Sequence, residues 1–295
     1  MADYTNPVTA AARTIYAETV LAELAKLAMP LRGFSTDFSA ETAKPGTTID
    51  ADFASASEVK TTFPGYTSFT DDGKSVKLEL DKDFSAGFTV EESKLMSRGA
   101  AYVQEAARLN AAAVVNAFVA EATTAATGAK ATQVLTLAKG AAFDAAALKA
   151  VYAKLISVGI DPAFATLALA GADYATLATS LPYNMIGRTD NAMATGVIGS
   201  ALGLREIIVG PGLTDTDFVS APSGLILAAR AIPLTSEGVP GFRREVFKDP
   251  ATGLTLTMTE AFDTSTGATT FSVRLIGGVN VADPKAIVKI TRAAS

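Results

Sequence analysis

Carboxylates and lysines are the residues best able to do chemistry in this chain, because its 295 residues include no histidine and no cysteine. The absence of both excludes Ser-His-Asp and Cys-His catalysis, as well as disulfides and thiolate metal sites. It also removes the commonest transition-metal ligand. What remains is acid-base chemistry by Asp and Glu, or amine chemistry by Lys.

Three carboxylate pairs have their members two residues apart: Asp50 and Asp52, Asp81 and Asp83, and Asp215 and Asp217. None of these pairs continues into the spacing of a calcium-binding loop. Solvated turns or strand faces account for them better than a cation site does, and weak cation binding is the minority interpretation.

Two further motifs are weak. The stretch from Ser57 to Lys60 fits S-x-x-K, but the companion K-T-G motif is missing, so a surface strand is the better interpretation. Gly196, Gly199 and Gly203 fit neither dinucleotide-binding nor P-loop spacing. We therefore expect no cofactor, no metal site and no enzyme activity. An α+β enzyme that uses carboxylates or a lysine stays open as the less favoured alternative.

Composition narrows the possible partners. The formal net charge of −5 and the scattered basic residues argue against a sequence-independent nucleic-acid binder. No apolar run reaches the roughly 18 residues of a membrane span, and the polar N-terminus does not look like a signal peptide. A hydrophobic content of 49% is enough for a sizeable core.

A long helix must organise the fold. Thr89 to about Thr127 predicts a single uninterrupted helix, started by a capping box of Thr89 and Glu92 and followed by Gly128. This helix is far longer than the average of about a dozen residues. Its expected apolar stripe consists of Met96, Val103, Ala107, Val114 and Phe118.

The preceding part of the chain predicts a helix and then an extended excursion. Asn6-Pro7 starts a helix that runs to about Ala28. Residues 34–53 are extended, with a turn at Pro45-Gly46, and Asp72-Gly73 signals a hairpin turn. Alternation of Val76, Leu78 and Leu80 with charged residues predicts a half-exposed strand.

The remainder mixes helices and strands, which indicates an α+β fold. Helices are predicted at 144–158, with Asp144 as the cap, and at 172–180 and 222–230. Strands are predicted at 133–138, 164–169, 204–209, 218–220, 242–247, 254–263, 269–276 and 287–291.

This order of elements resembles the major capsid proteins of tailed bacteriophages, with the Hong Kong ninety-seven phage-type fold. Residues 75–95 (SVKLELDKDFSAGFTVEESKL) resemble the junction between the extended loop and the spine helix of such coats. Residues 253–290 resemble their closing strands. The resemblance covers most of the chain, although it consists of patterns rather than invariant signatures.

The resemblance implies a division of the chain. It places an N-terminal arm and helix at 1–32, an extended loop region at 33–88, a peripheral domain with the spine helix at 89–142, an axial domain at 143–239 and peripheral return strands at 240–295. Subunit-interface candidates at the tip of the extended loop are Phe63, Pro64, Tyr66, Asp71, Asp72, Gly73 and Lys74. Spine-helix candidates are Glu91, Glu92 and Arg98, and axial-loop candidates are Tyr183, Asn184, Arg188 and Asp190.

The resemblance also implies partners. The chain is expected to assemble with itself into hexamers and pentamers of an icosahedral virion capsid, in the host cytoplasm, and to contact packaged DNA non-specifically at most. With no long segment before the first helix, a separate scaffolding protein and a portal are expected, and decoration proteins are a further candidate partner. No membrane is expected to be involved. Lys60 and Lys74 lie where some relatives crosslink, but we assume no crosslink. An encapsulin-like nanocompartment shell is the close alternative.

Overall fold

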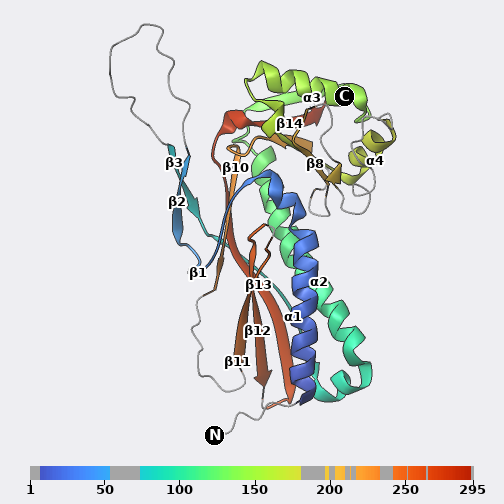
Figure 1. The fold of residues 1–295 in the computed structure, drawn as a ribbon, viewed down its shortest axis with the longest axis vertical. Helices are drawn as coiled ribbons and strands as arrows, with labels where there is room; N and C mark the ends of the chain where they lie inside the picture. Colours follow the sequence, from blue (N-terminus) through green and yellow to red (C-terminus); the bar gives the residue numbers. More distant parts are fainter. Residues whose placement is uncertain are drawn as a thin grey trace.

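The computed structural model describes residues 7–53, 74–180, 197–198, 203–209, 213, 217–232, 242–250, 252–263 and 265–293. Within these ranges the chain forms two six-stranded sheets, a two-stranded hairpin and four α-helices, which confirms the α+β class. The molecule is elongated, with two long helices beside the first sheet and two shorter helices with the second sheet at one end (Figure 1).

The two long helices, α1 (Pro7–Leu27) and α2 (Glu92–Thr127), lie side by side. A short 3-10 turn, η1 (Met29–Gly33), follows α1, so the predicted first helix and its end at Met29-Pro30 are confirmed. The buried side chains of α1 recur every four residues, which is the spacing of one helix face: Ala12, Tyr16, Val20 and Leu24.

The first sheet is built around one long strand, β13 (Ala268–Val281). Along one edge β13 pairs with β4, and along the other it pairs first with β12 and then with β10. The other strands of this sheet are β1 (Ser35–Thr42), β4 (Lys82–Glu91), β10 (Leu225–Ala231), β11 (Phe242–Lys248) and β12 (Thr255–Asp263). Both long helices pack on the apolar face of this sheet.

The start of α2 differs from the prediction. Thr89 lies in β4, where its hydroxyl is 2.9 Å from that of Thr270 on β13, so it does not cap the helix. The helix starts after Glu91, which has extended backbone and makes no side-chain cap. The expected capping box is therefore wrong, because strand pairing with β13 holds the backbone extended through residue 91.

The helix is also not continuous. Gly99 has φ 69° and ψ −167°, which breaks α2 into a short first segment and a long second one. Of the expected apolar stripe, Val103, Ala107, Val114 and Phe118 are buried, but Met96 is 67% exposed. Met96 lies before the break, so the helical periodicity that predicts the stripe does not extend to it.

The second sheet has shorter strands than the first, and α3 packs against it. Its strands are β5 (Gln133–Leu137), β6 (Thr166–Leu169), β7 (Val197–Ile198), β8 (Glu206–Val209), β9 (Asp217–Ser220) and β14 (Ile287–Arg292). The helices beside it are α3 (Ala145–Ser157) and α4 (Gly171–Ser180), with 3-10 turns η2 (Pro162–Phe164) and η3 (Pro284–Ala286). Asp144 caps α3 as predicted, accepting hydrogen bonds from the amides of Ala146 and Ala147.

One predicted helix is a strand. Residues 225–231, expected within a helix at 222–230, form β10, which lies fully buried between β1 and β13. A short apolar run has no periodicity that separates a buried strand from a buried helix.

The expected domain boundaries at 143–239 and 240–295 do not coincide with the two sheets. β10 belongs to the first sheet, whereas β5 and β14 belong to the second. The chain therefore passes between the sheets more often than the linear division implies.

The stretch Ser93–Thr127 of α2 is long and apolar enough to cross a membrane, by length and composition alone. Its buried residues pack against α1 and the first sheet, so the helix uses its apolar stripe inside the protein. This is the pattern of a core helix.

The break at Gly99 provides a test of the fold. Its backbone conformation is essentially restricted to glycine, so Gly99→Ala is expected to lower the free energy of unfolding by about 1–3 kcal/mol. Nothing lies within 4 Å of the position a Cβ would take, so the cost would come from the backbone alone. Gly171→Ala is the matched control, since Gly171 also has open space but no positive φ. Equal or higher stability of Gly99→Ala in urea denaturation would show that α2 runs straight.

Candidate functional site

A two-stranded hairpin lies to one side of the first sheet (Figure 1). It consists of β2 (Thr48–Phe53) and β3 (Lys74–Glu79), paired antiparallel from Thr48 with Glu79 to Phe53 with Lys74. The predicted strand alternation is confirmed, because Leu78 and Leu80 are buried while their neighbours are exposed. The hairpin therefore has a fixed base and points away from the core.

The base of the hairpin is anchored by close backbone approach. A Cβ on Gly278 of β13 would lie 2.1 Å from the carbonyl oxygen of Glu79, so only glycine permits this contact. The Asn280 side chain donates to the carbonyl of Lys77 at 2.9 Å and accepts from Lys130 Nζ at 2.8 Å. A small apolar cluster, including Leu78, Leu80 and Ile276, closes the junction. No sequence motif signalled this anchor.

The expected interface residues at the hairpin tip mostly lie outside the described residues. These are Phe63, Pro64, Tyr66, Asp71, Asp72 and Gly73. Lys74 is the first residue of β3 and pairs with Phe53. The axial-loop candidates Tyr183, Asn184, Arg188 and Asp190 also lie outside the described residues.

The three spine-helix candidates cluster at the start of α2. Glu91 is the last residue of β4, and its Oε1 forms an ion pair with Lys94 Nζ at 3.5 Å. Glu92 is the first residue of the helix. The Arg98 guanidinium lies 5.0 Å from the centre of the Tyr102 ring, a cation–π contact across the break at Gly99. Beside them, an apolar groove of about 520 Å³ runs between α1 and the first turns of α2.

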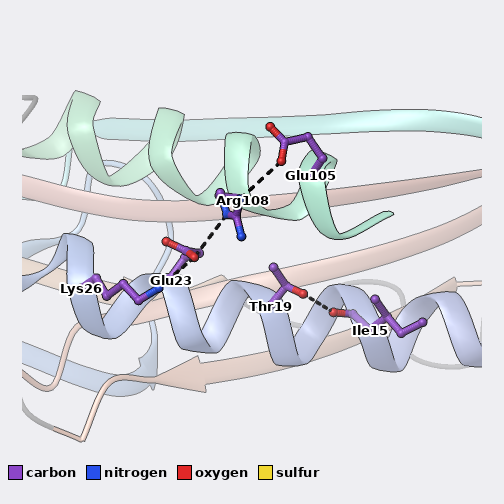
Figure 2. Close-up of polar contacts among 6 residues, drawn as sticks. All are labelled: Ile15, Thr19, Glu23, Lys26, Glu105 and Arg108. Atoms are coloured by element: carbon purple, nitrogen blue, oxygen red, sulfur yellow. Dashed lines mark hydrogen bonds and ion pairs between the residues drawn. The ribbon is translucent and has the colours of Figure 1, made fainter. Parts of the chain in front are cut away.

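Polar contacts fix the register of α1 on α2. Glu23 of α1 accepts from Arg108 of α2 at 3.3 Å and from Lys26 at 3.1 Å, while Arg108 also reaches Glu105 at 3.5 Å (Figure 2). These pairs are largely exposed and contribute little stability individually. The Tyr16 hydroxyl accepts from the Asn110 amide at 3.0 Å, and burial raises the pKa of Tyr16 to about 12.

A cluster of exposed apolar side chains lies on the second sheet's helices. Tyr152 and Ile156, four residues apart on α3, are 40% and 56% exposed, and Phe164 of η2 is 61% exposed. We call these three residues the α3 ridge. Large exposed apolar side chains that gather in one place mark interaction surfaces. The helix prediction identified α3 but not which of its apolar residues stay outside the core.

A buried carboxylate pair is the arrangement closest to a catalytic site. Asp217, at the start of β9, and Asp173, on α4, both pair with the guanidinium of Arg292 at the end of β14. Asp217 Oδ1 also accepts from the amide of Ala170 at 2.9 Å. Asp217 belongs to one of the carboxylate pairs of the sequence, but its pair member Asp215 lies outside the described residues. Among the described residues, the carboxylate beside Asp217 is Asp173.

The two carboxyls titrate differently. Burial and the hydrogen bond with Asp173 raise the pKa of Asp217 to about 7. Burial opposes ionisation of Asp173, but hydrogen bonds from Arg292 and Asp217 lower its pKa below the usual value. Such a division is typical of acid-base pairs. However, the Asp217 side chain is only 2% exposed, so a substrate cannot reach it in this conformation.

The members of the Asp81 and Asp83 pair each lie beside a basic side chain. Asp83 pairs with Arg274 of β13, and Asp81 lies 3.7 Å from Lys82 Nζ. Within the described ranges, no group of three or more Asp and Glu side chains could hold a metal ion. The described geometry thus offers surfaces for contact rather than a reaction site.

Comparison with known proteins agrees with this. A family model described as "Phage capsid protein" matches residues 90–290. No curated protein sequence matches the chain significantly.

Solved structures share the fold over most of the chain at low sequence identity. The capsid of Ralstonia phage GP4 is 8% identical, with a TM-score of 0.56 over 89% of this chain and 88% of that one. A virus-like particle from Pyrococcus furiosus is 14% identical, with a TM-score of 0.55 over 92% and 96%. Mycobacterium phage Ogopogo is 15% identical, with a TM-score of 0.51 over 87% and 90%.

The hairpin anchor can be tested with Gly278→Ala. The added Cβ forces β13 and β3 apart, and overpacking of this kind costs about 1–3 kcal/mol or more. We expect the free energy of unfolding to fall and amide protection to be lost in residues 74–80 before the rest of the first sheet. Unchanged protection of that strand would mean that the hairpin does not rest on β13.

Proposed function

The chain belongs to the phage capsid protein family, and on that premise we propose that its copies form hexamers and pentamers that close an icosahedral shell around genomic DNA. The protein is a structural component of the virion capsid, with the Hong Kong ninety-seven phage-type fold. The observation that carries the proposal is the family match over residues 90–290, which includes α2 and most of both sheets.

The projecting hairpin supports assembly by heterologous contacts. A hairpin that points away from its own core adds little to the stability of the subunit, because an isolated two-stranded sheet is only marginally stable in water. Lying over a neighbouring copy would bury it, and a head-to-tail contact repeated by rotation closes a ring. We assign this role to the loop region with its tip at Phe63, Pro64, Tyr66 and 71–74.

The α3 ridge supports a second self-contact. Tyr152 and Ile156 lie on the same side of α3 as Lys149, one turn apart, and Phe164 is exposed on the turn η2 that follows this helix. Apolar and aromatic side chains at the centre with charges at the rim are usual at protein interfaces. We infer that a neighbouring copy covers this ridge within a capsomer.

The remaining partners follow from the proposed assembly. A separate scaffolding protein and a portal are proposed for assembly in the host cytoplasm, and decoration proteins are a further candidate outside the shell. The net charge of −5 favours at most non-specific contact with packaged DNA. A virus-like particle from Pyrococcus furiosus shares the fold, so fold alone does not identify the kind of shell, and an encapsulin-like nanocompartment stays the alternative proposal. The family match favours the coat.

Deletion of residues 63–74 tests the role of the hairpin tip. The deletion removes only Lys74, the end residue of β3 that pairs with Phe53, from the paired strands of the hairpin, so we expect a folded subunit with normal circular dichroism and thermal unfolding. Shell formation, followed by electron microscopy and size-exclusion chromatography, is expected to be lost. Shells of normal size from this variant would refute the assignment.

Ile156→Asp tests the α3 ridge. Ile156 is 56% exposed, so the charge should leave subunit stability within about 0.5 kcal/mol, as for most surface substitutions. In an interface the same charge would be desolvated, so capsomer yield is expected to fall at least about tenfold. Ile156→Leu, which keeps an apolar side chain, is the matched control and should assemble normally. Equal assembly of both variants would place the ridge outside any subunit contact.

A further inference from the structure

We propose that Asp173, Asp217 and Arg292 form a proton-sensitive latch that holds α4 on the second sheet and releases it as the pH rises above neutrality. The latch joins three elements that are distant in the sequence: α4, β9 and β14. It is a property of the folded subunit and does not depend on the proposed shell.

Within the described part of the chain, α4 has few other attachments, and one of them is the partly buried Tyr174, which packs against the core of the second sheet. It has ten residues, and Leu177 is its buried side chain. Its first turn is held by the Asp173–Arg292 pair, and the residue before it, Ala170, donates its amide to Asp217. Arg292 is itself fixed by a 3.1 Å hydrogen bond from Nε to the carbonyl of Ala141. The three side chains therefore connect the start of α4 to the edge of the sheet.

The charges in the latch balance only with one proton on the pair. Two ionised carboxylates around a single guanidinium leave one uncompensated negative charge, and burial makes that costly. The Asp217 side chain is 2% exposed, so its own carboxylate has little contact with water, whereas Asp173 and Arg292 are partly exposed. With a proton on Asp217, its hydroxyl can donate to Asp173, and Arg292 balances the remaining carboxylate.

Among the residues that the structure describes, no other charged group near Asp217 replaces this proton. The charged groups that act on it are Asp173 from α4 and Arg292 from β14. β6 has no charged side chain, and Glu206 of β8 registers with Thr166 at the far end of β6. Lys289 of β14 donates to the carbonyl of Thr127. Burial raises the pKa of Tyr174 on α4, so this group stays neutral near pH 7.

The direction of the pH effect follows from linkage. Burial and Asp173 raise the folded-state pKa of Asp217 to about 7, above the value in an opened state, so the closed latch binds the extra proton. The stabilisation is present at low pH and is lost as the pH rises through about 7. Opening of α4 becomes easier at alkaline pH, which makes this helix a two-state element biased by a local charge change.

Amide hydrogen exchange of the full chain, in one fixed assembly state, tests the latch. Protection of α4, corrected for intrinsic exchange rates, is expected to fall about tenfold between about pH 6 and about pH 8.5. Protection of α3, on the same sheet, is expected to hold. Asp217→Asn keeps a neutral donor at this position, so α4 should stay protected at both pH values.

Several results would overturn the proposal. These are equal protection of α4 at both pH values in the unaltered chain, an equal fall in α3, or a persistent fall in Asp217→Asn. If that variant does not fold, Asp173→Asn serves the same purpose, because Arg292 then faces a single carboxylate. The fall in α4 protection between the two pH values should then shrink to less than about threefold. A full tenfold fall in Asp173→Asn would exclude the shared proton.

Discussion

The packing of α1 and α2 on the apolar face of β13 is the constraint on which the rest of the structure depends. Phe271 of β13 lies against Tyr16 of α1, and a Cβ on Gly277 would lie 2.8 Å from the Phe118 ring of α2. β13 in turn pairs with β4, β10 and β12. The same core reaches Phe218 and Ile287 of the second sheet, so one strand positions both sheets and both long helices.

This arrangement explains why the outward-facing features are well placed for contact. The hairpin leaves the body where Gly278 of β13 allows the backbone of Glu79 to approach, so its direction is set by the core. The α3 ridge lies at the same end of the molecule, on a helix whose inner face is fully packed. A rigid body with exposed arms suits a subunit that tiles a shell, since its contacts need little ordering on assembly.

The sequence predicted most elements but not their junctions. Capping by Asp144 and the alternation in β3 are local signals, and both are confirmed. The strand at 225–231 and the loss of the Thr89 cap both result from pairing with the distant strand β13. The break at Gly99 has no signal in the helical pattern around it. The Asp173–Asp217 pair and the α3 ridge were missed for the same reason, because neither has a signature within a single stretch of sequence.

The most direct test of the central claim is to express the chain alone and to examine it by negative-stain electron microscopy and size-exclusion chromatography. Closed shells or ring-shaped capsomers are the predicted result, because the family match and the projecting contact surfaces describe a self-assembling coat. A well-behaved monomer or small dimer, even with a scaffolding protein added, would contradict the account.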